Sequence, residues 1–590
     1  MTPPRSARVL LALAAVAVMF AAADTYVVVL SLPDMMGSVG LSVEQLQRAA
    51  PIVSGFLLGY VAMLPLIGRV ADLRGRPSVL VAALLVFAFG SLVTAAAYDL
   101  GSLVTGRFLQ GVGGGGLVPV TLALVADLYP ADRRGVPLGV VGAVQELGSV
   151  VGPLYGAVVI SIGGWRDIFW INLAVALVLA AAIVTLRHGS LRKGEILSRR
   201  GRSLRSLDYP SLLLLLLTLA GLLLVMRQPD SLVTSVSLGG PFVPFHDGGS
   251  IWFSQVGLAT VALGVLLLAR LLTARRPLVD LRGWWRSVRE ADLVGALLLS
   301  VALAGVILAF ATADPQVQVF SEAGPWWLAM AAVGAVLFGL HNRRSSAPLL
   351  PHGAFSQVAA WGSLVVSFFV GAALIAALVD IPIFARLTIA DGSQVQAALV
   401  LVEFLVALPV GALVGGVLTR RAPAGAIAAV GMLLAAVGFW LMADWSFGSL
   451  HHLSSSAVLV LSGFGFGLAL APVNAALLAS TDAGSHGVAS ALLVVARMVG
   501  MLVGISALTT IGLRRYYAVE VDIPSPNDVC SGGRTRCAAY ERLIEAAGIE
   551  QLHAIFLGAG ICAVVAGVVA LLCFRHAATQ SRPAAELLVG

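Results

Sequence analysis

Five of the ionisable side chains inside long apolar stretches of this sequence carry most of its potential chemistry. They are Asp24, Arg107, Glu146, Glu403 and Arg497. Placing a charge inside a stretch long enough to cross a bilayer costs several kcal/mol, so such residues usually line substrate or proton paths. Carboxylates in that setting can take up and release protons, and guanidinium groups can hold them in the ionised form.

Asp24 and Arg107 are expected at similar depths. Asp24 lies about 24 Å along its helix when counted from Arg8, and Arg107 lies about 8 Å below the outer end of its own helix. Because an unpaired buried charge is expensive, we predict that the two side chains pair. The pair keeps Asp24 ionised until competition for Arg107 or a change in water access lets it take a proton. Two alternatives stay open: Asp24 only caps or packs, and Arg107 only extends to the outer headgroups.

Glu146 falls near the middle of its apolar segment, where desolvation favours the protonated carboxyl. Two carboxylates in different environments are a workable basis for proton coupling. Glu403 and Arg497 each lie about 12–15 Å into their helices, so the sequence predicts that they can pair near the midplane. Arg497 also lies beside Gly500 and Gly504 at helical spacing, which leaves a packing role open.

A strip of small residues follows Glu146. Gly148, Gly152 and Gly156 recur every four residues, so they share one helix face and let a neighbouring backbone approach closely. Pro153 lies beside the strip and predicts a bend there. A packing seam without a transport role is the alternative.

The turn between the second and third apolar segments, residues 68–80, reads GRVADLRGRPSVL. Gly68 and Gly75 permit close backbone approach. Asp72 can face a helix N-terminus and Arg76 can pair with a carboxylate. A generic basic turn is the alternative.

Composition limits the fold that positions these residues. The 590 residues are 59% hydrophobic and 11% charged, with a mean hydropathy of +0.96, which excludes a soluble globular protein. The net charge of +7 comes from basic residues in alternate loops, a pattern of membrane topology rather than of nucleic-acid binding. We find no nucleophile elbow, His/Asp pair or acidic metal cluster, so we expect neither an enzyme, nor a metal, nor a cofactor other than a proton gradient.

We count sixteen apolar segments, each long enough to cross a bilayer, and expect an all-α polytopic membrane protein. Basic residues favour one set of loops by about three to one, which places both termini in the cytoplasm. The segments divide into a six-helix bundle at 1–187, a basic linker with inserted central hairpins at 188–357, and a second six-helix bundle at 358–590. If one central hairpin is only interfacial, the count falls to fourteen.

The last outer loop has its own features. The two final segments are longer than a bilayer requires, so we expect the hairpin at 514–551 to project outward. Cys530 and Cys537 lie in that loop on the oxidising side, which predicts a disulfide. Their spacing, without His or further Cys, is weak as a metal site.

The motifs resemble those of the drug/proton antiporters of the major facilitator superfamily. The strip at 148–156 is similar to the family's antiporter motif, except that its final glycine is Ala157. The turn at 68–80 resembles the family's loop motif, with Leu73 and Pro77 in place of basic residues. The spacing of Arg107, Gln110 and Gly111 resembles its proton-transfer motif.

DTYVVV at 24–29, VQELGSVVGP at 144–153, ALVDIPIF at 377–384 and HGVASALLVVARMVGMLVG at 486–504 resemble one branch more narrowly. It is the actinobacterial triacylglycerol and multidrug exporter that is encoded with a periplasmic lipoprotein. The resemblance covers both six-helix halves and not the second central hairpin.

This resemblance implies the major facilitator fold, with two bundles related by a pseudo-two-fold axis. It implies export of neutral lipid or amphiphilic drugs across the bacterial cytoplasmic membrane by a monomer, driven by proton influx, with a periplasmic lipoprotein as carrier. Asp24 and Glu146 are then the coupling candidates. A generic multidrug/proton antiporter without a lipid role is the alternative.

Overall fold

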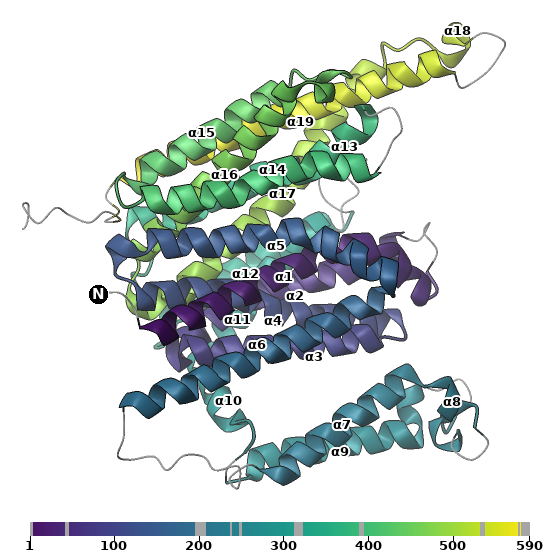
Figure 1. Cartoon of the computed structure of the whole chain (residues 1–590), viewed down its shortest axis with the longest axis vertical. Helices are drawn as coiled ribbons and strands as arrows, with labels where there is room; N and C mark the ends of the chain where they lie inside the picture. The colour runs from purple at the N-terminus through teal and green to yellow at the C-terminus, as the bar shows by residue number, and fades with distance from the viewer. Residues whose placement is uncertain are drawn as a thin grey trace, which may run out of the picture.

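The computed structural model describes residues 4–41, 46–194, 208–235, 239–246, 250–275, 277–311, 322–388, 394–530, 537–575, 577 and 579. Within these ranges, sixteen helices are long and apolar enough to cross a membrane. The expected all-α polytopic fold is therefore confirmed, with sixteen spans rather than fourteen (Figure 1).

The first six long helices form the lower middle of the molecule in Figure 1. They are α1 (Arg5–Ser38), α2 (Leu46–Arg74), α3 (Arg76–Ala96), α4 (Leu100–Leu128), α5 (Gly135–Ile162) and α6 (Trp165–Gly194). α4 packs between α2 and α3, while α1 packs along α5. Asp99 and Ser102 form a capping box that fixes the start of α4, the helix that carries Arg107.

The last six long helices form a second group above it. They are α13 (Val358–Thr388), α14 (Gln394–Leu418), α15 (Ala424–Met442), α16 (Leu453–Ala479), α17 (His486–Glu520) and α19 (Ala538–Cys573), with the short α18 (Pro526–Val529) before the last. α16 packs against α14 and α15, and α13 packs against α17 and α19. The two groups meet where α2 packs on α17 and α5 packs on α14.

The central four long helices form two hairpins in different surroundings. They are α7 (Tyr209–Arg227), α9 (Gln255–Thr273), α11 (Leu293–Ala311) and α12 (Gly324–Arg344), with the short α8 (Asp230–Val233) and α10 (Leu281–Glu290) between them. α11 packs on α2 and α17, and Ser300 Oγ donates a 2.7 Å hydrogen bond to the carbonyl oxygen of Ala62. The α7–α9 pair lies at the edge and packs mainly on itself, touching α3.

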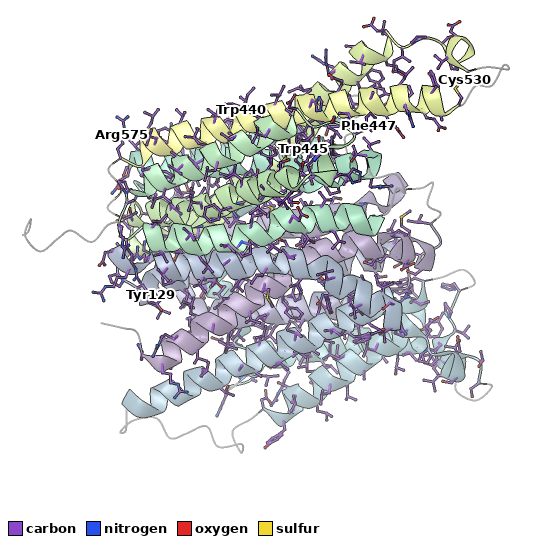
Figure 2. The ribbon with its side chains drawn as sticks, turned by 45° about the horizontal axis from the view of Figure 1, so that its top comes forward. Tyr129, Trp440, Trp445, Phe447, Cys530 and Arg575 are labelled. Atoms are coloured by element: carbon purple, nitrogen blue, oxygen red, sulfur yellow. A yellow bond between two sulfur atoms is a disulfide. The ribbon has the colours of Figure 1, made fainter. Side chains whose placement is uncertain are left out.

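α1 begins and α19 ends on the same side of the molecule. We call the surface at which α1 begins and α19 ends the terminal face, and the opposite surface the far face. Arg575 and Tyr129 lie on the terminal face, and Cys530 lies at the far extremity of the molecule (Figure 2). On the far face the ends of α17 and α19, together with α18, extend past the neighbouring helices (Figure 1).

α6 is longer than the sequence predicts, whereas α17 and α19 have the expected excess length. α6 continues past residue 187 to Gly194, because leucine, arginine and lysine are good helix formers and a helix need not end where the membrane does. The rest of the basic linker, residues 195–207, lies outside the described residues. α17 and α19 have 35 and 36 residues, so each is about 50 Å long and exceeds a bilayer core of about 30 Å.

Candidate functional site

A buried polar cluster joins α1, α4 and α6. Arg107 Nη1 lies 2.7 Å from Asp24 Oδ2, and the side chains are 2% and 0% exposed. Asn172 Nδ2 donates to Asp24 Oδ1 at 2.6 Å, and Gln110 Oε1 accepts from Arg107 at 2.9 Å. The two side chains that were predicted to lie at one depth therefore pair, and two neutral amides add hydrogen bonds to them.

Gly111 brings α2 against this cluster. A Cβ atom at Gly111 would collide with the carbonyl oxygen of Phe56, so a side chain there would push α2 away. The guanidinium carbon of Arg107 lies 4.4 Å from the centroid of the Phe56 ring, a geometry in which the ring face attracts a cation.

The small-residue strip of α5 packs against α1. The strip consists of Gly148, Gly152 and Gly156, with Pro153 beside it in the sequence. A Cβ atom at Gly148 would collide with the main chain of Met19, and one at Gly152 would crowd that of Ala23. The strip thus positions α5, with its Glu146, against the helix that carries Asp24.

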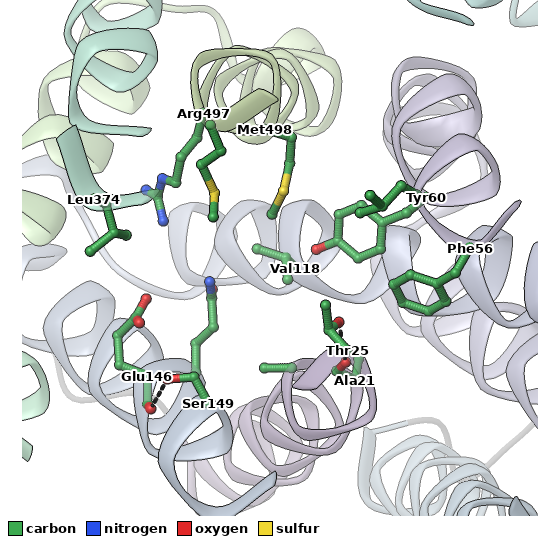
Figure 3. Close-up of a pocket in the computed structure, with 14 residues that line it drawn as sticks. Ala21, Thr25, Phe56, Tyr60, Val118, Glu146, Ser149, Leu374, Arg497 and Met498 are labelled. Atoms are coloured by element: carbon green, nitrogen blue, oxygen red, sulfur yellow. Dashed lines mark hydrogen bonds between the residues drawn. The ribbon is translucent and has the colours of Figure 1, made fainter. Parts of the chain in front are cut away.

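A cavity of about 650 Å³, part of it open to solvent, lies between the two groups of helices. Residues of α1, α2, α4 and α5 line one side of it, and residues of α13 and α17 line the other. Glu146 and Arg497 reach toward one another across it (Figure 3), and the arginine is near enough to attract the carboxylate. Glu146 comes from the first six long helices and Arg497 from the last six.

A second, smaller cavity, part of it open to solvent, meets the first at this pair. The residues that line both cavities are Val118, Gln145, Glu146 and Arg497. The second cavity continues to Leu122 and Asn474, which lie toward the ends of α4 and α16 at the terminal face. Glu146 and Arg497 therefore lie where the second cavity, on the side of the terminal face, adjoins the first.

The predicted pairing of Glu403 with Arg497 is wrong. Glu403 is exposed on α14, whereas Arg497 lines both cavities. Depth along a helix fixes only the height of a side chain, and the direction in which it points depends on packing.

The turn after α2 joins the two groups of helices at the terminal face. Asp72 accepts hydrogen bonds from the backbone N–H groups of Gly487 at 2.9 Å and Val488 at 3.1 Å, in the first turn of α17. Arg76 Nη2 lies 2.9 Å from Asp72, and its Nε lies 3.1 Å from Asp127. The carboxylate of Asp72 thus faces a helix N-terminus, where negative charge is stabilised.

Two further contacts and one tight turn lie at the same face. Gly68 lies directly against Gly487, and Gly75 adopts a φ of +92° at the turn into α3, a conformation that glycine tolerates. Arg134 donates to the carbonyl oxygen of Leu478 at 3.0 Å. Desolvation by partial burial lowers the pKa of Arg134.

Two buried polar residues of the long helices were not predicted from the sequence. Asn172 bonds Asp24, and no motif marks it. Asp380 is buried in α13 and is 6% exposed. The stretch VDIPIF could have pointed to Asp380. α13 begins the last six long helices as α1 begins the first six, and each of these two helices carries an aspartate beyond its middle.

Comparisons with known proteins agree with this architecture. Residues 14–350 match the family pattern described as the Major Facilitator Superfamily. A triacylglyceride transporter of Mycobacteroides abscessus is 33% identical, with 87% of this chain and 84% of that protein aligned. A triacylglyceride transporter of Mycobacterium tuberculosis is 32% identical over 96% of this chain and 94% of its own length.

Two solved structures share the fold. The human organic anion transporter MFSD10 has a TM-score of 0.51 at 14% identity, with 96% of this chain and all of that chain covered. The proton:xylose symporter XylE has a TM-score of 0.50 at 13% identity, with 94% of each chain covered. At such identities the likeness concerns the fold alone.

Proposed function

The chain belongs to the major facilitator superfamily, and we propose that it is a proton-coupled exporter of triacylglycerol-type lipids. It is a multi-pass membrane transporter of a family that does not consist of enzymes. The observation that carries the proton coupling is that Glu146 and Arg497, from different halves, line both cavities. The relatives named as triacylglyceride transporters support the lipid substrate.

The proposed cycle turns on the charge of Glu146. The ionised carboxylate attracts Arg497 and draws the two halves together beside the closed contacts of the terminal face. A proton that arrives from the far side neutralises Glu146, removes this attraction and lets the terminal face open. Release of the proton at the open terminal face restores the negative charge of Glu146. The terminal face then closes and substrate moves outward, so each export step follows the inward movement of a proton.

Asp24 has a second role in this proposal. Its carboxylate balances the buried guanidinium of Arg107, and protonation of Asp24 would leave that cation without its counter-charge. Protonation is therefore favoured only when α1, α4 and α6 rearrange so that water or substrate reaches Arg107. This links proton uptake at Asp24 to movement of the first group of helices.

The assignment of sides follows from charge. We place the terminal face in the cytoplasm of a bacterium, because the loops on that face carry the excess of basic residues. The hydrogen bonds of Asp72 to the start of α17 then close the cytoplasmic side of the transporter.

The projecting hairpin at 514–551 supports a lipid substrate over a water-soluble one. Leaving the bilayer unaided is prohibitive for a triacylglycerol at about 25 cal/mol per Å² of apolar surface. Tyr517, near the projecting end of α17, and Val521, directly after that helix, are 49% and 85% exposed, and so offer apolar surface beyond the membrane. We assign the hairpin to guiding lipid into the outer leaflet or to a periplasmic lipoprotein carrier.

Proton flux in liposomes distinguishes this function from generic multidrug/proton antiport. The purified full-length chain is reconstituted in vesicles that hold a pH dye, and an imposed pH gradient is followed after addition of triacylglycerol or of a cationic dye. The proposal expects triacylglycerol to speed the loss of the gradient. A response to the cationic dye alone would favour the generic antiporter.

A further inference from the structure

We propose that the exposed face of α10 is a binding site for the headgroups of anionic phospholipids. Four side chains of this helix are exposed and lie on one face at helical spacing: Arg282, Trp285, Arg286 and Arg289. The proposal does not depend on what the transporter exports or on the direction of transport.

The position of α10 along the chain confines it to the membrane surface. Seven residues separate the end of α9 from its start, and only Ala291 and Asp292 separate its end from α11. Both neighbours are membrane-spanning in length and composition. Figure 1 shows α10 on the terminal-face side, between the main body and the α7–α9 pair, with its axis across theirs. A helix tethered in this way lies within about one turn of the headgroups.

The opposite face of α10 is occupied by the protein. Trp284 and Val288 pack against the core of the first helices, and Ser287 is buried. The guanidinium carbon of Arg74, at the end of α2, lies 4.5 Å from the Trp284 ring. This docking orients α10, so that its arginines and Trp285 point away from the protein.

The nearby acidic groups do not neutralise this face. Asp280 caps α10 by accepting the N–H of Gly283 at 2.9 Å and pairs with Arg74 at 3.4 Å. The backbone bond, Arg74 and, to a smaller extent, Arg286 hold the pKa of Asp280 below its usual value. Glu290 stands exposed at the end of the helix. Three arginines therefore face outward against Glu290 and an Asp280 that is shared with Arg74, so the face keeps a positive charge.

This combination fits an anionic lipid surface. A guanidinium group binds phosphate oxygens through two parallel N–H donors, and an indole ring prefers the headgroup region. Attraction of one basic residue to an anionic leaflet corresponds to about a fivefold change in affinity. Three arginines with a tryptophan beside them make a cationic interfacial helix anchored to the transporter by its other face.

Fluorescence quenching tests the site directly. The full-length chain is reconstituted in phosphatidylcholine and phosphatidylglycerol in equal parts, with bromine on the acyl chains of one lipid or the other. Trp285→Phe is measured beside the wild type, and the difference isolates Trp285 from the other tryptophans of the chain. We expect phosphatidylglycerol to quench Trp285 several-fold more than phosphatidylcholine, and high salt to weaken this preference.

Charge variants complete the test. Arg282→Gln, Arg286→Gln and Arg289→Gln together should abolish the preference. A matched control removes three exposed arginines from other loops of the terminal face, Arg133, Arg420 and Arg421, and should keep it. Equal quenching by the two lipids in the wild type, or a preference that survives loss of the three α10 arginines, would overturn the proposal.

Discussion

Glu146 of α5 and Arg497 of α17 face each other from opposite halves of the molecule, at the place where two cavities meet. Each residue belongs to a helix that also holds the halves together, because α5 packs on α14 and α17 packs on α2. A change in the charge of one side chain therefore acts at the interface whose opening and closing moves substrate. This arrangement is the physical basis of the proposed proton coupling.

Removing the charge of Asp24 should both uncouple and destabilise the transporter. Asp24→Asn leaves Arg107 buried without its counter-charge, which costs about 3–5 kcal/mol. We expect a clear fall in the thermal unfolding temperature and loss of proton-driven export. Adding Arg107→Gln should recover part of the stability but not the export. Wild-type export by Asp24→Asn would remove Asp24 from the mechanism.

The terminal face should open when Asp72 loses its charge. Asp72→Asn weakens two hydrogen bonds to the start of α17, and bonds of this charged kind contribute about 1.5–3 kcal/mol. We expect the population open at the terminal face to rise by roughly tenfold or more, since 1.4 kcal/mol corresponds to a tenfold change. Distances between spin labels on exposed Leu73 and Asp482 report the opening. Unchanged distances would show that the remaining contacts suffice to keep the face closed.

The two cysteines of the projecting hairpin should be oxidised in purified protein. Cys530 and Cys537 are joined, with Cα atoms 5.8 Å apart, while Cys562 and Cys573 are free. Alkylation of the denatured chain should therefore label two cysteines before reduction and four after it, as read by mass spectrometry. Four labelled cysteines without reduction would contradict this pairing.

Shortening 514–551 to a tight turn should stop lipid export while sparing folding and proton binding. The helices inside the membrane keep their packing, but the exposed apolar surface beyond it is lost. Arg515→Ala is the control: it breaks the exposed pair with Glu550, at 2.9 Å, and such pairs contribute about 1 kcal/mol at most. Normal lipid export by a well-expressed shortened chain would mean that the hairpin only braces the far face.

Properties that depend on position along a helix were predictable from the sequence. The sixteen spans follow from the lengths of apolar runs, and the pairing of Asp24 with Arg107 follows from their equal depths. The contact of Asp72 with a helix N-terminus follows from a motif whose residues have defined chemistry. In each case the prediction needed only distance along a helix and residue type.

Properties that depend on rotation about a helix axis were not predictable in this way. Arg497 and Glu403 share a depth, yet Arg497 turns to Glu146 and Glu403 turns outward, because packing sets the direction of each side chain. The two central hairpins are alike in composition. Yet the α11–α12 hairpin packs against α2 and α17, and the α7–α9 hairpin lies at the edge. Asn172 escaped notice because a neutral amide in an apolar helix becomes informative only when its partner is known.

Coupled proton flux with Glu146→Gln tests the central claim most directly. The variant and the wild type are reconstituted in vesicles that hold a pH dye, and loss of an imposed pH gradient is followed with and without triacylglycerol. Glu403→Gln is the matched control, since it neutralises a carboxylate at membrane depth that faces away from both cavities. We predict that triacylglycerol speeds proton flux in the wild type and in Glu403→Gln but not in Glu146→Gln. Substrate-dependent flux through Glu146→Gln with the pH dependence of the wild type would contradict the account.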